Sequence, residues 1–96
     1  MKSTLQNYAT TNLLHRLVIR TEKQYSGLFY FLIESHEGLC FYSTLDESLG
    51  LAIRDIEIYC TPELYSELKR LLGIFQQVFP LEVRSEEVIK DNKEHN

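Results

Sequence analysis

The pattern of apolar and polar residues is most regular over 61–79, where apolar side chains recur at helical spacing. The apolar stripe consists of Leu64, Leu68, Leu71, Leu72, Phe75 and Phe79. Pro62 suits the first helical position, the Thr61 hydroxyl can cap the start, and Pro80 ends the segment. The pattern therefore predicts an amphipathic helix whose stripe needs a partner surface.

The segment 13–20 has the apolar, β-branched composition of a strand. Alternation puts His15, Leu17 and Ile19 on one face, and Leu14, Arg16, Val18 and Arg20 on the other. We expect the first face to point to the core. The second face mixes charged and apolar side chains, which predicts that it is half exposed or covered by another subunit.

Two further strands, 39–45 and 51–60, are predicted on either side of a turn-rich loop. Ile53 is out of phase with Ile56, which predicts a bulge between them. A short fourth strand at 81–83 follows the long helix.

The segment 22–35 is predicted to be a helix that is apolar over more than half of its circumference. Thr21 can cap its start, and Gly38 suits a left-handed end. We expect an inward face of Tyr25, Leu28, Phe29 and Leu32, flanked by Phe31 and Ile33, with Tyr30 pointing away. A helix on a small sheet needs an apolar stripe of only about 100°. The excess predicts additional cover, from the N-terminal residues or from a second chain.

The order strand, helix, strand, strand, helix, short strand predicts an α+β fold, a ferredoxin-like βαββα(β) sandwich. In this fold an antiparallel four-stranded sheet carries two helices on one face. We expect the domain to span 13–83, between a flexible N-terminal arm over 1–12 and a disordered charged tail over 84–96. The mixed second face and the apolar excess of the first helix predict a homodimer. Its possible interface residues are Phe29, Tyr30, Ile33, Val18 and Tyr59.

Charge and composition exclude several classes of function. The net charge is -4 and the lysines and arginines are scattered, so the basic patch that a nucleic acid requires is missing. The chain has no apolar run of about 18 residues, so no membrane span is expected. Its N-terminal residues are polar and lack the apolar region of a secretory signal, which predicts a cytoplasmic location.

The two cysteines, Cys40 and Cys60, belong to no CxxC pair. We expect both to be free and buried as small apolar residues, with a disulfide and a reactive or metal-ligating role as alternatives. If Thr44 pairs with Leu51 in the hairpin, Cys60 lies several residues beyond the partner of Cys40. Their Cα atoms would then be separated by more than the bridging limit of about 7 Å.

Sequence motifs for catalysis are missing from the chain: it has no G-x-S-x-G elbow, no P-loop and no dinucleotide glycine pattern. Acylphosphatases of this topology need a glycine-rich, arginine-bearing loop where this chain has TEKQ at 21–24. Tyr42 and Tyr59 are placed to stack on RNA bases, but Asp55 and Glu57 would repel phosphates. We therefore expect no enzymatic activity, no cofactor and no nucleic-acid partner.

Three functional hypotheses follow. The first is a non-enzymatic interaction or regulatory module that is homodimeric or binds another protein. The alternative is a small-ligand sensor similar to ACT domains, which would bind its ligand at a subunit interface near the first strand–helix loop. The third is a metal-binding protein or enzyme that uses His36 together with Glu34, Glu37 or Cys40.

Structural motifs over 16–72 carry a resemblance to one family. They are a step from Glu34 to Gly38 and Leu39 at the first helix end, a hairpin with Asp46 and Gly50, and a proline-started last helix. The matching segments read LVIR at 17–20, LFYFLIESHEGLCFYSTLD at 28–46 and IEIYCTPELYSELKRLL at 56–72. With these features the chain resembles a family of small bacterial proteins known only as a domain of unknown function. The resemblance implies a ferredoxin-like fold and no particular activity.

Overall fold

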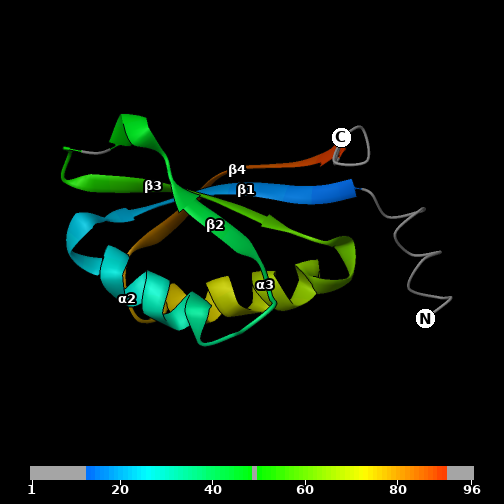
Figure 1. Cartoon of the computed structure of the whole chain (residues 1–96). Helices are drawn as coiled ribbons and strands as arrows, with labels where there is room; N and C mark the ends of the chain where they lie inside the picture. Colours follow the sequence, from blue (N-terminus) through cyan, green and yellow to red (C-terminus); the bar gives the residue numbers. More distant parts are fainter. Residues whose placement is uncertain (1–12, 49, 91–96) are drawn as a thin grey trace, which may run out of the picture.

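The computed structural model describes residues 13–48 and 50–90. Within these residues the chain forms, in order, β1 (Leu13–Glu22), α2 (Lys23–Glu34), β2 (Phe41–Thr44), the 3-10 helix η1 (Asp46–Ser48), β3 (Ile53–Cys60), α3 (Pro62–Phe75) and β4 (Leu81–Lys90). The strands pair antiparallel in one four-stranded sheet of order β2-β3-β1-β4. Both helices lie on the same side of this sheet (Figure 1). The fold is therefore α+β, and the described helices leave the other face of the sheet open.

The hydrophobic core lies between the sheet and the two helices. Its fully or nearly fully buried members are Leu17, Ile19, Phe29, Ile33, Ile56, Ile58, Cys60, Leu68, Leu71, Leu72, Phe75 and Phe79. The ring of Phe29 on α2 meets the ring of Phe75 on α3 edge to face, with 6.0 Å between centroids. The predicted inward faces of the first strand and of the long helix are thus confirmed. No helix among the described residues is long and apolar enough to cross a membrane.

Helix α2 is rotated relative to the prediction. Phe29 and Ile33 are its buried residues, whereas Leu28 is exposed. Tyr30, predicted to point away, is half-buried against the core and stacks on Tyr42 of β2, with 5.1 Å between ring centroids. The contact with β2 draws one side of the helix toward the sheet edge, and the opposite side is exposed as a result.

The predicted helix caps at Thr21 and Thr61 were both wrong. Thr21 belongs to β1, is buried, and donates its hydroxyl hydrogen bond to the carbonyl oxygen of Pro80 at 2.8 Å. Thr61 is the N-cap residue of α3 and Pro62 follows it as predicted, but in the described structure the Thr61 side chain makes no capping hydrogen bond. The left-handed conformation predicted at Gly38 is confirmed, with φ of 81°.

The irregularity in the sheet lies in β4, and the predicted bulge in the third strand was wrong. β3 pairs with β1 in unbroken register from Ile53 to Cys60. The register between β1 and β4 shifts between Val18 and Ile19, which leaves Arg84 as the extra residue. Ile53 therefore lies on the open face, two residues before Asp55, and does not join the core.

The predicted disordered tail was wrong as far as Lys90, because β4 continues to that residue. Charged side chains are compatible with a strand here because β4 is at the edge of the sheet, where they also discourage pairing with other chains. Glu86 forms an ion pair with Lys69 of α3, and Glu87 forms one with Arg16 of β1. The predicted N-terminal arm over 1–12 and the segment 91–96 lie outside the described residues.

Candidate functional site

The open face of the sheet carries a row of side chains drawn from all four strands. The strand registers pair Phe41 with Tyr59, Tyr59 with Arg16, and Arg16 with Glu87. The row therefore crosses the sheet from β2 to β4. Phe41 is 75% exposed, although it stands beside half-buried neighbours. This exposed aromatic ring beside the half-buried Tyr59 and Arg16 makes the row the candidate contact surface of the chain.

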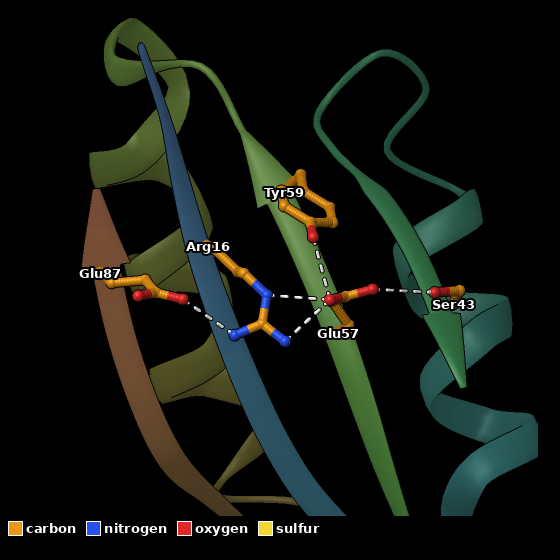
Figure 2. A network of polar contacts seen from close by, with 5 residues as sticks. All are labelled: Arg16, Ser43, Glu57, Tyr59 and Glu87. Atoms are coloured by element: carbon orange, nitrogen blue, oxygen red, sulfur yellow. Dashed lines mark hydrogen bonds and ion pairs between the residues drawn. The ribbon is translucent and has the colours of Figure 1, made fainter. Parts of the chain in front are cut away.

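A network of polar contacts surrounds Glu57 at the centre of this face (Figure 2). Arg16 Nε donates a hydrogen bond to Glu57 Oε2 at 2.8 Å, and Arg16 Nη2 lies 2.8 Å from the same oxygen. The Tyr59 hydroxyl donates to Glu57 Oε2 at 2.9 Å, and the Ser43 hydroxyl to Oε1 at 3.4 Å. Arg16 Nη1 also donates to Glu87 Oε2 at 3.0 Å. One guanidinium thus joins β3 to β4 across β1.

The electrostatics of the network keep its groups charged. Burial would raise the pKa of Glu57, but the hydrogen bonds from Arg16 and Tyr59 outweigh burial and lower it below its usual value. The hydrogen bond to Glu57 raises the pKa of Arg16 in turn. A carboxylate that is held ionised by several hydrogen-bond donors is a poor base for proton transfer.

A second ion pair stands on the same face, nearer the α2 end of β1. Arg20 donates to both carboxylate oxygens of Asp55, with Nε 2.7 Å from Oδ1 and Nη2 3.0 Å from Oδ2. These hydrogen bonds lower the pKa of Asp55. Such a two-point contact has a fixed geometry, which makes it stronger than a single surface ion pair. The two arginines of β1 are therefore both neutralised within the face.

Of the predicted interface residues, Val18 and Tyr59 lie on this open face and are half-buried. The assignment of Phe29 and Ile33 to the interface was wrong, because both side chains are buried in the core of the single chain and do not reach its surface. Tyr30 packs on the covered side of the sheet, where its hydroxyl group meets that of Thr44. The surface predicted on the first helix is thus largely its core contact.

The residues proposed for a metal site do not gather into one. His36 Nδ1 lies 2.9 Å from the carbonyl oxygen of Leu32. Glu34 accepts a hydrogen bond from the hydroxyl of Tyr42, which raises the pKa of Tyr42 to about 12. Among residues 13–48 and 50–90 there is no group of three or more His, Cys, Asp or Glu side chains that could hold a metal ion.

A hollow of about 690 Å³ lies at the junction of β1 and α2, where a ligand sensor was expected to bind. It is lined by Glu22, Lys23, Gln24, Ala52 and Ile53. The backbone N–H of Lys23 donates to the carbonyl oxygen of Ala52 at 2.8 Å, which ties the two sides of the hollow together. Its volume falls within the range of about 300–1,000 Å³ that small-molecule sites occupy.

The hairpin between β2 and β3 has a different register from the predicted one. Thr44 pairs with Ile56 and not with Leu51, because η1 and the turns around it lengthen the connection. Phe41 consequently pairs with Tyr59. The sequence signal was present in the turn residues of 46–50, which are too many for a tight hairpin. Both cysteines are free thiols, as predicted; Cys60 is buried as expected, whereas Cys40 is only half-buried.

The fold and the open face together define a small α+β protein with an ion-paired, partly apolar sheet surface. Comparisons with protein-family models, with curated proteins and with solved structures find no match for this chain. The resemblance to small bacterial proteins of unknown function therefore stays a prediction, as does the cytoplasmic location.

Proposed function

We propose that this protein is a non-enzymatic interaction module of ferredoxin-like fold that forms a homodimer through the open face of its sheet. The strand order β2-β3-β1-β4, with α2 and α3 on one side, supports this fold assignment. The observation that carries the function is the row across the open face. In this row the exposed ring of Phe41 lies near charged side chains that are already paired with each other within the chain.

Covering this face with a second chain costs less desolvation free energy than its number of charged side chains suggests. The side chains of Glu57 and Asp55 are only 18% and 16% exposed in the single chain, so neighbouring side chains already exclude much of the water. Breaking a buried pair is costly, whereas covering an intact one leaves no charge without a partner. Around the pairs lie apolar side chains of half-buried residues, including Leu14, Val18 and Ile89, which gain from being covered.

The charge pattern favours a second copy of the chain as the occupant. Arg16 and Arg20 are paired within the face, so the surface presents both signs of charge side by side. A strongly acidic or basic partner would have to compete with these pairs. A second copy related by a two-fold axis brings the same alternation and can set opposite charges against each other.

Light scattering on the purified chain at micromolar concentration tests the proposal, and a dimer is the expected result. Phe41→Ser should weaken association by about tenfold or more, because it removes the most exposed ring of the face. Phe31→Ser is the matched control, since Phe31 is 67% exposed on α2, in the opposite layer. A strictly monomeric wild type, or a dimer that Phe31→Ser disrupts and Phe41→Ser does not, would overturn the proposal.

A second candidate function is favoured by the hollow at the β1–α2 junction, which supports a small-ligand sensor. Lys23 and Glu22 provide one charge of each sign, and Ala52 and Ile53 provide an apolar wall. This lining suits a small ligand that has both polar and apolar groups, such as an amino acid or nucleotide. A thermal-shift screen against these two classes tests this function. A rise in Tm that Lys23→Ala abolishes would support it, and a panel without any rise would refute it.

A further inference from the structure

The register of β2 and β3 directs the two cysteines of the chain toward each other. Phe41 of β2 and Tyr59 of β3 are the last paired residues at this end of the two strands. Cys40 directly precedes β2 and Cys60 ends β3, so the same register continued by one residue sets Cys40 opposite Cys60. Both side chains lie on the covered side of the sheet, because Cys60 belongs to the core and Cys40 packs against it.

The hydrogen-bond pattern of the hairpin defines the kind of pair they form. The N–H of Leu45 donates to the carbonyl oxygen of Asp55 at 2.8 Å, which marks 45 and 55 as a hydrogen-bonded pair in the same register. Hydrogen-bonded and non-hydrogen-bonded pairs alternate along an antiparallel ladder. Cys40 and Cys60, five steps further, occupy a non-hydrogen-bonded position. Opposite Cα atoms there lie about 4.5 Å apart, within the disulfide range of about 4.4–6.8 Å.

A small cavity of about 160 Å³ separates the β2–β3 end from the start of α3. Cys40, Cys60 and Thr61 line it, together with Leu14, Leu39 and Leu64. This volume is too small for an ordinary cofactor, but it is free space that borders both cysteines. Thr61 Oγ1 is buried and, among the described residues, without a hydrogen-bond partner, so its hydroxyl is available to donate to a thiolate.

We infer that Cys40 and Cys60 form a reversible disulfide across β2 and β3 by exchange with a low-molecular-weight disulfide such as oxidised glutathione. The thiolate of Cys40, the more exposed of the two, attacks one sulfur of glutathione disulfide and releases one glutathione thiolate. The thiolate of Cys60 then attacks the Cys40 sulfur and releases the second. Two protein thiols are oxidised, one small disulfide is reduced to two thiols, and the two protein protons pass to the released thiolates.

The environment of the two thiols makes this exchange slow and pH-dependent. Burial raises the pKa of Cys40 to about 11, and the neighbouring Cys60 adds to the effect. Burial likewise raises the pKa of Cys60 to about 11. Because only the thiolate attacks, the rate of exchange rises by about tenfold for each pH unit below that value. The pair is therefore resistant to brief oxidation and responds to a sustained change in redox conditions.

The test equilibrates the full chain with reduced and oxidised glutathione at set ratios and measures intact mass after acid quenching. The expected product has lost two hydrogen atoms and carries no glutathione. The fraction of oxidised protein should depend on the square of the reduced glutathione concentration divided by the oxidised glutathione concentration, and it should fall as this quotient rises. An intramolecular disulfide requires this dependence. A fraction that follows the simple ratio of the two concentrations, with a glutathione adduct on the wild type, would overturn the inference.

Two variants separate the steps. Cys60→Ala should stop at a glutathione adduct on Cys40, and Cys40→Ser should stay reduced over the same ratios because its remaining thiol is buried. Cys60 lies in the core, so its variant can fail to fold. In that case the inference is decided by two measurements: the redox state of Cys40→Ser, and the dependence of the wild-type product on the two glutathione concentrations. Disulfide-linked dimers as the main wild-type product, or a wild type that stays reduced in excess oxidised glutathione, would contradict the inference.

Discussion

Arg16 of β1 reaches diagonally across the sheet to Glu57 of β3, two residues from its direct register partner Tyr59. Diagonal neighbours on one face of a sheet are about 7–8 Å apart at Cα, a distance that only a long side chain can cover. The same guanidinium contacts Glu87 on the other neighbouring strand. Arg16 therefore links three of the four strands of the open face, namely β3, β1 and β4.

The first prediction concerns this cross-strand contact. Arg16→Met keeps the length of the side chain but leaves Glu57 without its main donor, so we expect a loss of about 1–2 kcal/mol in unfolding free energy. Urea denaturation at neutral pH measures it. Arg70→Met is the control: Arg70 pairs with Glu67 one turn away on α3, and both side chains are well exposed. That variant should lose less than about 0.5 kcal/mol. Equal losses in the two variants would show that the network contributes nothing special.

The second prediction is a dependence of stability on pH. The pKa of Glu57 is lower in the folded chain than its ordinary value of 4.5, because hydrogen bonds from Arg16 and Tyr59 outweigh burial. The resulting stabilisation is complete above that value and is lost as the pH falls through the lower pKa of the folded state. Below pH 4.5 the free energy of unfolding should therefore decrease less steeply with falling pH for Glu57→Gln than for the wild type, as urea denaturation at several pH values would measure. Glu37→Gln, an exposed change outside the network, should follow the wild type.

The fold was predictable from the sequence wherever one face of an element is clearly apolar. The alternation in β1 and the stripe of α3 are of this kind, and both faces were assigned correctly. The charged strand β4 was missed beyond Val83, because its exposed residues have no apolar period and only pairing with β1 makes them a strand. In α2 the apolar residues surround the helix, so periodicity placed Phe29 correctly on the inward face but did not distinguish the buried Ile33 from the exposed Leu28.

The open face was predictable in composition but not in its contacts. Arg16 and Arg20 lie an even number of positions apart, as do Asp55 and Glu57, and this indicated one mixed face on each strand. Which arginine meets which carboxylate depends on the strand register, and the register depends on loop lengths. The same dependence explains why the two cysteines were predicted to lie far apart. A connection that includes η1 sets the hairpin register differently from a tight turn.

The third prediction concerns the unpaired hydroxyl at the start of α3. Thr61→Val keeps the shape of the side chain and removes a buried oxygen that, in the described structure, has no partner. We expect it to stabilise the fold by about 1 kcal/mol, the cost of an unsatisfied buried polar group. Thermal and urea denaturation measure the change. If Thr61 instead capped α3 in solution, the same variant would lose about 1 kcal/mol, so the sign of the effect decides.

The fourth prediction tests the position of Tyr30. Its ring stacks on Tyr42 at an interplanar angle of 14°, and its hydroxyl meets that of Thr44. Tyr30→Phe keeps the stacking and should lose about 0.5–1.5 kcal/mol, whereas Tyr30→Ala should lose about 2–4 kcal/mol. A Tyr30→Ala variant as stable as the wild type would show that the side chain points into solvent, as the helical period alone predicted.

The fifth prediction tests whether the charged segment after Val83 is part of the fold. In the structure, residues 85–90 pair with β1 from Leu13 to Val18, and Glu86 contacts Lys69 and Tyr65 of α3. A chain that ends at Val83 loses these contacts and exposes one edge of the central strand β1, so we expect it to be unfolded or to aggregate. The matched control ends at Lys90 and keeps every described element, and it should match the full chain in Tm and in circular dichroism. If the chain ending at Val83 folds with an unchanged Tm, the far half of β4 contributes nothing to stability and the charged segment is a tail after all.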